Sequence, residues 1–217
     1  MAADEPSDEE LYAAWEGGDE RAANALIDRH LRSIGRFFAN KVTDASDAED
    51  QACKVFEIVS RKLGSFERNS SFRTYLFGVA RNVLRDYVKY KRRRRGEVDF
   101  QLTAVRDLGP SPSAIVAERK DQLLLLQALR AIPLAYQIII ELSYFEEMTQ
   151  AEIAELLELP PGTVASRIRR GKKMLDEKME ELAESQDVLE STRHGLQDWA
   201  DDLKKQLAEF EAHEEPR

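Results

Sequence analysis

Apolar residues recur every three or four positions along successive segments of this chain, and short polar breaks separate the segments. This spacing predicts amphipathic helices. Breaks rich in Gly, Pro, Asp or Ser predict helices over about 20–39, 47–63, 72–95, 114–132 and 134–145, with only a short helical turn from Leu11 to Trp15. We therefore expect an all-α chain of two small helical domains joined by a linker at 96–113.

A further pair of helices is predicted between Thr149 and Leu175. Thr149 and Glu152 have the spacing of a capping box, in which each side chain binds a free backbone N–H at a helix start. Residues 159–163, Leu-Pro-Pro-Gly-Thr, end that helix because proline disfavours the helical conformation in the residue before it. Proline is tolerated in the first turn of the following helix. The stretch is read as helix, tight turn, helix.

The second of these helices carries two stripes, which differ in chemistry. At about 100° per residue, an apolar stripe and a polar stripe lie roughly 120° apart. The apolar stripe is Val164, Ile168, Gly171 and Leu175, and the polar stripe is Thr163, Ser166, Arg167 and Arg170. Hydroxyls and guanidiniums can bind base edges and phosphates in a major groove that admits a helix. We favour a DNA-binding helix-turn-helix over a plain hairpin with a solvated basic face, because cap, turn and stripe agree.

The distribution of charge supports a nucleic-acid partner although the net charge is −9. The excess of acids over bases lies at the two ends, 1–10 and 185–217, and leaves the interior close to neutral. Within it, residues 61–95 hold twelve Lys or Arg against two acids, and residues 161–178 hold six against two. Such clusters, rather than net charge, control the attraction of phosphates.

The first basic cluster alternates with aromatic residues. A polar loop at 64–71 precedes the helix at 72–95, in which Phe, Tyr, Arg and Lys are interleaved. Rings that stack on bases and cations that follow phosphates suit single-stranded nucleic acid. The plainer interpretation is that most of these rings belong to the core, and the basic run Lys91–Arg95 lies along a phosphate backbone or is simply solvated.

Several other classes of protein are excluded by composition. No apolar run approaches the 18 or so residues of a membrane span and no signal peptide is present, so we expect a cytoplasmic protein without membrane contact. The single cysteine, Cys53, forms no internal disulfide, and the three histidines lack ligand spacing. We expect no metal, no cofactor and no catalytic residue.

The acidic segment 185–217 carries an apolar heptad pattern at Leu189, Leu196, Leu203 and Phe210. This pattern predicts an amphipathic helix that needs a partner. Two hypotheses stay open. The helix packs on its own domains and restrains their access to DNA, or it is a solubilising or partner-binding tail.

Three motifs in this order resemble the extracytoplasmic-function sigma factors, small members of the sigma-70 family of bacterial RNA polymerase. The first is Asp47-Ala48-Glu49-Asp50 with Val55-Phe56, and the second is Phe72-Arg73-Thr74-Tyr75-Leu76-Phe77 with Ala80-Arg81-Asn82. The most specific is Glu152-Ile153-Ala154 with Gly162-Thr163-Val164-Ala165-Ser166-Arg167. The resemblance covers about residues 10–182.

The resemblance implies a promoter-specificity subunit that binds core RNA polymerase and promoter DNA and helps to melt the DNA. It implies sigma region 2 at 11–95, the linker at 96–113 and a helix-turn-helix region 4 at 114–184. The acidic tail at 1–10 and the extension at 185–217 lie outside the resemblance. The β′ clamp of core polymerase would bind Asp47, Glu49, Asp50, Val55 and Phe56, and the β flap is a further expected partner. The minus-ten element would bind Arg68, Asn69, Ser70, Phe72, Arg73, Arg81, Asn82, Arg85 and Lys89. The minus-thirty-five element would bind Thr163, Ser166, Arg167, Arg170 and Lys173.

The chain departs from the family pattern at two places. Cys53-Lys54 stands where the family has Gln-Glu, which adds a cation to an acidic docking surface, and Tyr75 stands where tryptophan is usual. The sequence does not say whether an anti-sigma factor exists. The alternative function is a dimeric helix-turn-helix repressor or activator that binds duplex operator DNA, and a third is a helical adaptor that binds only protein. The alternatives leave the 47–95 motifs or both basic clusters unexplained.

Overall fold

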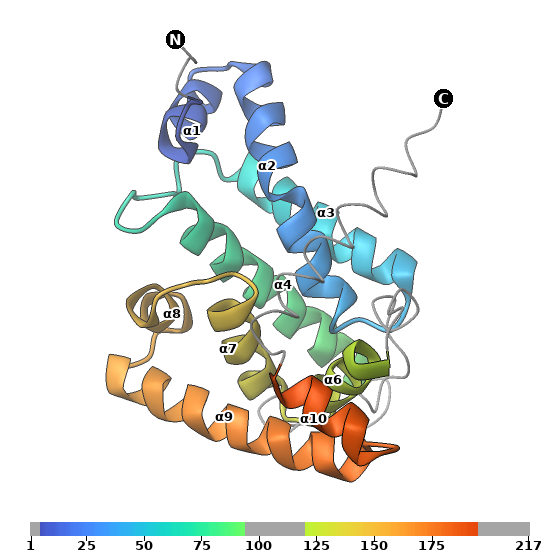
Figure 1. Cartoon of the computed structure of the whole chain (residues 1–217). Helices are drawn as coiled ribbons and strands as arrows, with labels where there is room; N and C mark the ends of the chain where they lie inside the picture. Colours follow the sequence, from blue (N-terminus) through green and yellow to red (C-terminus); the bar gives the residue numbers. More distant parts are fainter. Residues whose placement is uncertain (1–4, 94–119, 195–217) are drawn as a thin grey trace.

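The computed structural model describes residues 5–93 and 120–194, and their regular structure is entirely helical. The helices are α1 (Asp8–Glu16), α2 (Glu20–Ala39), α3 (Ala45–Arg61), α4 (Phe72–Arg93), α6 (Lys120–Ala131), α7 (Leu134–Tyr144), α8 (Gln150–Leu157), α9 (Pro161–Leu182) and α10 (Gln186–His194). Helices α1–α4 form an N-terminal bundle and α6–α10 a C-terminal bundle (Figure 1). The predicted linker at 96–113 and the extension beyond residue 194 lie outside the described residues.

Side-chain caps fix most of the helix starts. The predicted cap by Asp19 and the predicted capping box of Thr149 and Glu152 are both present. Asp44 caps α3, which begins at Ala45, two residues before the predicted start. The one clear difference is at α1, where Ser7 and Glu10 form a second capping box. Three acids assigned to the tail, Asp8 to Glu10, are therefore the first turn of a helix, where they complement its dipole.

The core of the N-terminal bundle lies between α2, α3 and α4, with α1 packed against α2 and α4. Large apolar side chains from each helix are fully buried there, among them Tyr12, Ile34, Phe38, Val59, Leu76 and Leu84. In the C-terminal bundle α9 lies along α6 and α7. A Cβ at Gly171 would come within 3.1 Å of Ile140, so the glycine lets α9 approach α7 closely.

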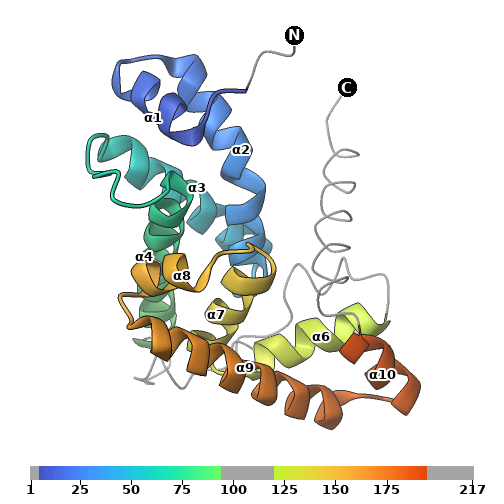
Figure 2. The ribbon, with the colours of Figure 1, turned by 60° about the vertical axis from the view of Figure 1, so that its left-hand side comes forward.

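The two bundles pack against each other. Helix α8 lies along α4 in both views of the molecule (Figures 1 and 2). The apolar core is continuous across this contact, since Leu76 and Val83 of α4 belong to the same cluster as Ile153 and Leu157 of α8. The relative placement of the bundles is therefore set by side-chain packing as well as by the chain that joins them.

Buried charges cross the same contact. The ammonium group of Lys41, fully buried at the end of α2, is paired with Glu141 of α7 and donates to the carbonyl of Phe37 at 2.8 Å. Gln137 donates to the second oxygen of Glu141 at 2.8 Å. Burial lowers the pKa of Lys41, and the carboxylate of Glu141 opposes that shift. The ion pair thus compensates two charges that neither bundle could bury alone.

A second ionic group lies a few residues further along. The carboxylate of Glu146, 5% exposed, accepts hydrogen bonds from Arg36 of α2 at 2.6 Å and from Arg73 of α4 at 2.9 Å. Arg73 also donates to the backbone carbonyl of Glu146. Two cations of the N-terminal bundle therefore hold one acid of the C-terminal bundle.

We predict that Lys41→Met weakens the packing of the bundles by about 3–5 kcal/mol, because Glu141 is left buried without its cation. Small-angle scattering during a urea titration should show the variant expanding at lower urea than the wild type. Arg61→Met is the control, because the Arg61 and Glu57 side chains are 76% and 51% exposed and such a pair contributes no more than about 0.5 kcal/mol. Equal midpoints for Lys41→Met and wild type would contradict the prediction.

Candidate nucleic-acid interface

Helices α8 and α9 form the predicted helix-turn-helix. Helix α8 ends at Leu157, and Glu158 adopts a left-handed backbone conformation with φ of 55° that closes the turn. Pro161 is the first residue of α9, where its missing N–H costs nothing. Val164, Gly171 and Leu175 are buried and Ile168 is half-buried, so the predicted apolar stripe of α9 faces the core.

The polar stripe of α9 faces solvent. Ser166, Arg170 and Lys173 are exposed, and Thr163 and Arg167 are half-buried. The Ser166 hydroxyl donates to the carbonyl of Thr163 at 2.9 Å, so it is already engaged within the helix. Two further exposed cations, Arg169 and Lys172, flank the stripe and were missed because they lie outside the predicted face. In the sequence, the run of basic residues from Arg167 to Lys173 was the feature that could have indicated them.

The loop between α3 and α4 borders a cavity of about 330 Å³. One wall is the loop from Ser65 to Ser70, and a second wall is the first half of α4, with Thr74, Tyr75, Gly78, Val79 and Asn82. Glu155 and Leu156 of α8 line it as well. The cavity therefore lies between the polar loop of one bundle and the helix-turn-helix of the other, a neighbour that the sequence did not indicate.

The predicted minus-ten residues divide into exposed and buried groups. Arg68 and Asn69 are exposed on the loop and Ser70 is half-buried. Phe72 must be removed from this group as a correction, because it is 1% exposed and packs against Tyr12 and Phe66 in the core. The alternation of aromatic and basic residues in the sequence could not reveal this burial, because the Phe72 ring is covered by Tyr12 of α1, a helix far away in the sequence.

Farther along α4, the basic residues approach α9, the second helix of the helix-turn-helix. Arg81 and Arg85 are half-buried, and Asn82 and Lys89 are exposed. Burial, together with the nearby cations Arg85 and Arg167, lowers the pKa of Arg81, while Glu158 opposes the shift. The cationic surfaces of the two bundles are thus adjacent in this arrangement.

The predicted polymerase-binding helix is α3. Glu49 and Asp50 are exposed, together with Cys53 and Lys54. Asp47 accepts a hydrogen bond from Tyr87 at 2.8 Å and pairs with Lys91 at 2.7 Å, which lowers its pKa and ties α3 to α4.

Val55 and Phe56 were predicted to contact the polymerase as well. They are 0% and 8% exposed, and we correct their assignment to core residues that support α3 from inside. They are buried because residues 48, 52, 55, 56 and 59 form the inward face of the helix.

Comparison with protein families gives two adjacent matches. The family model for Sigma-70 region 2 matches residues 26–94, and that for Sigma-70, region 4 matches residues 122–175. Together they cover more than half of the chain. The chain belongs to the sigma-70 family.

Curated relatives are RNA polymerase sigma factors, several of them named as ECF sigma factors. The RNA polymerase sigma-H factor of Pseudomonas aeruginosa is 27% identical over 184 residues, which cover 81% of this chain and 95% of the relative. The ECF RNA polymerase sigma factor SigW of Bacillus subtilis is 26% identical over 174 residues, with 76% and 92% covered. This sigma factor thus resembles its relatives over nearly their whole length.

Solved structures share the fold. CnrH in complex with the cytosolic domain of CnrY aligns with a TM-score of 0.62 at 21% identity, covering 82% of this chain and 100% of that chain. The sigma factor RpoE in complex with the anti-sigma factor NepR from Bartonella quintana aligns with a TM-score of 0.54 at 19% identity, covering 72% and 96%. Across residues 5–93 and 120–194, no helix is long and apolar enough to cross a membrane.

We predict that Arg167→Ala weakens binding to the minus-thirty-five duplex by about 1–3 kcal/mol if the guanidinium reads a base. Affinity should be measured on a duplex whose sequence has been selected from a random library and on a scrambled duplex. A loss on the selected duplex alone indicates base reading, and an equal loss on both indicates a phosphate contact. No loss on either duplex would contradict a DNA contact. Arg21→Ala, which makes the same change at an exposed position of α2, is the control.

Proposed function

We propose that this sigma factor acts by binding alone and divides promoter recognition between its two bundles. The sigma factor directs promoter-specific initiation by binding core polymerase, reading both promoter elements and aiding DNA melting. One observation supports this division. Each bundle presents its own cationic surface, on α9 in the C-terminal bundle and beside the polar loop and its cavity in the N-terminal bundle.

The exposed stripe of α9 would enter the major groove of the minus-thirty-five element. Arg170 and Lys173 are exposed and Arg167 is within reach of the surface, so base edges and phosphates are both accessible to them. The buried stripe on the other side fixes the helix against α7. The stretch from Thr163 to Lys173 supplies the contacts, because the acids of α9 begin at Asp176 and would repel phosphates.

The polar loop and its cavity would take up a flipped base of the non-template strand at the minus-ten element. Separation of the strands costs about 1.4 kcal/mol per base-pair step, so captured bases and phosphate contacts must offset it. Asn69 and Ser70 at the cavity offer hydrogen bonds to a base edge, and Arg81, Arg85 and Lys89 lie along α4 toward the phosphates. Binding thus drives the opening of the DNA.

The exposed acids of α3 would dock on the polymerase clamp. We predict that the double variant Glu49→Lys/Asp50→Lys lowers affinity for core polymerase at least about tenfold, because two carboxylates become like charges on a surface that recognises acids. The matched control is Glu20→Lys/Asp28→Lys, which makes the same charge change on exposed positions of α2. Fluorescence anisotropy with labelled protein measures both. Equal affinities for the two double variants would remove α3 from the docking surface.

The packed arrangement of the bundles cannot hold both promoter elements at once. Elements about 25 base pairs apart are separated by about 85 Å of duplex, since each base pair rises about 3.4 Å. A compact chain of this length has a radius of gyration of about 17 Å and is about 45 Å across. Residues 94–119, fully extended, reach about 90 Å, so the covalent connection permits separation.

We infer that the described arrangement is a closed state that must open on the promoter. The packed α8 lines the cavity with Glu155 and Leu156, and a carboxylate at that place repels a nucleic-acid strand. The contact is also imperfect, because Asn40 is buried with both amide atoms lacking partners within the described residues. Such groups cost about 1–3 kcal/mol each, which keeps the closed state from being overly stable. An anti-sigma protein, like the one bound to the structural neighbour RpoE, would act by binding this closed state.

The start of the acidic extension contacts the C-terminal bundle. Helix α10 packs on α6 and α9, with Leu189 buried in their core. This supports the hypothesis that the extension folds back on the protein, and we propose that it restrains opening. Deletion of residues 195–217, which keeps Leu189, should raise promoter-dependent transcription. Unchanged activity would leave the extension as a solubilising or partner-binding tail.

The function as a whole is tested with core polymerase and a library of random double-stranded upstream sequences. The protein should co-elute with core and start transcripts from a subset with two common elements. A protein that shifts duplex DNA alone as a dimer, and does not bind core, would instead be an operator-binding regulator.

A further inference from the structure

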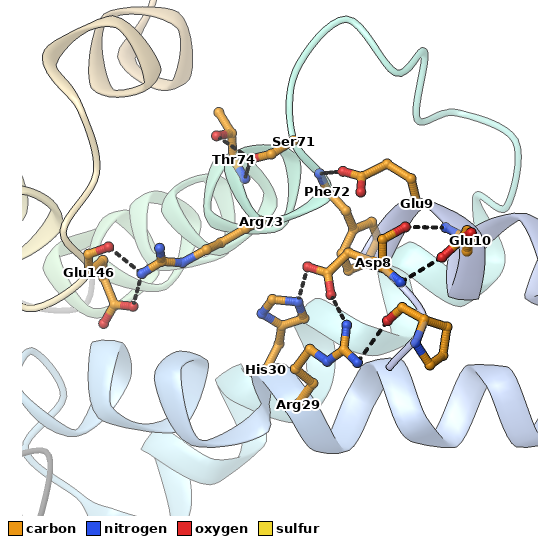
Figure 3. A network of polar contacts seen from close by, with 12 residues as sticks. Asp8, Glu9, Glu10, Arg29, His30, Ser71, Phe72, Arg73, Thr74 and Glu146 are labelled. Carbon is orange, nitrogen blue, oxygen red and sulfur yellow. Dashed lines mark hydrogen bonds and ion pairs between the residues drawn. The ribbon is translucent and has the colours of Figure 1, made fainter. Parts of the chain in front are cut away.

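Helix α1 lies outside the family match, which begins at residue 26, yet it is firmly held. Its capping box closes the first turn, and Leu11 and Tyr12 are buried. Asp8 anchors it to α2 through Arg29 at 2.7 Å and His30 at 2.6 Å (Figure 3). Burial raises the pKa of Asp8, but the hydrogen bonds of His30 and Arg29 outweigh that effect and lower it overall. The helix therefore has a fixed position on the bundle.

From that position α1 contacts the polar loop at three points. At the start of the loop, the Tyr12 hydroxyl accepts a hydrogen bond from the Gly64 N–H at 2.9 Å. In the middle, Glu16 pairs with Arg68 at 2.5 Å. At the end, the Glu9 carboxylate accepts the free N–H of Phe72, the first residue of α4, at 3.4 Å (Figure 3). One short helix thus holds the loop along its length.

Contacts with α4 hold the two ends of the loop, through the hydroxyl pairs Ser65–Tyr75 and Ser71–Thr74, and the middle of the loop depends on α1. The loop residues from Glu67 to Asn69 are exposed, and both Gly64 and Arg68 have positive φ, 90° and 57°. A non-glycine residue in that conformation costs of order 1 kcal/mol and persists only when its surroundings hold it. The packing of Phe66 against the Tyr12 ring, 5.2 Å between centroids, adds a further anchor from α1. None of the residues of α1 lines the cavity, so the helix leaves it free for a ligand.

The position of Glu16 indicates that its ion pair with Arg68 stabilises the loop rather than α1. It lies in the last turn of α1, where a carboxylate opposes the helix dipole and destabilises the helix. Its partner Arg68 belongs to the loop. Neutralising Glu16 should therefore leave α1 at least as stable and free the loop.

We propose that α1 is a positioning element for the strand-capturing loop, with Tyr12 and Glu16 as positioning residues that never touch the DNA. The proposal rests on the proposed function of the loop at the minus-ten element. By holding the loop in its binding conformation before the strand arrives, α1 removes part of the ordering cost of capture.

The test uses full-length protein bound to core polymerase, with Tyr12→Phe, Glu16→Gln and the control Glu20→Gln, an exposed acid in the first turn of α2. The probes are a single-stranded oligonucleotide that carries the selected non-template minus-ten sequence and a duplex that carries only the minus-thirty-five element. Each α1 variant should bind the oligonucleotide about three to ten times more weakly, as expected for one lost hydrogen bond. Affinity for the duplex and for core polymerase should not change, and Glu20→Gln should match the wild type on all three.

Two results would overturn the proposal. Unchanged oligonucleotide binding by both variants would show that the loop does not need α1, and a parallel loss of affinity for core would show a merely structural role. Failure of the proposed function looks different. In that case the wild-type holoenzyme itself would bind the selected oligonucleotide no better than a scrambled one.

Discussion

The packed arrangement of this sigma factor depends on a buried ion pair between Lys41, just beyond the end of α2, and Glu141 of α7. Charges at this depth are tolerated only while each has its partner. The pair is therefore satisfied when the bundles meet, and each group returns to water when they part. When the bundles part, the ion pair is lost but both ions become hydrated. The net change in free energy is therefore small compared with the cost of burying either ion alone. A contact built in this way is specific in geometry without being permanent.

This constraint connects the two DNA surfaces to each other. Arg73 lies in the first turn of the helix that carries the proposed minus-ten residues, and its partner Glu146 lies three residues before the cap of α8. Closure of the ion pairs therefore places α8 over the cavity at the same time. A strand cannot engage the proposed minus-ten cavity fully while α8 is packed over it, although the polar stripe of α9 stays exposed, so use of both surfaces on one promoter requires the bundles to part.

The sequence predicted those parts of the structure that depend on local chemistry. Asp19, Thr149 and Glu152 cap the helices as expected, because a cap involves residues only a few positions apart. The apolar stripe of α9 was also evident from spacing alone. Phe72, Val55 and Phe56 were misassigned because a motif shows which residues recur and not which way they face. The contacts of Lys41 with Glu141 and of Tyr12 with Gly64 join residues far apart in the chain, so no local pattern announces them.

The most direct test of the account is the distance between the bundles in the free and the promoter-bound protein. Labels placed at Ser60→Cys in α3 and Gln186→Cys in α10, in a Cys53→Ser background, occupy exposed positions on separate bundles. Their separation can be measured by pulsed electron resonance or by energy transfer. We expect a single distance in the free protein, within the roughly 45 Å width of the closed arrangement, and an increase by tens of ångströms with core polymerase and promoter, toward the roughly 85 Å between the elements. An unchanged distance in a complex that makes transcripts would contradict the closed state.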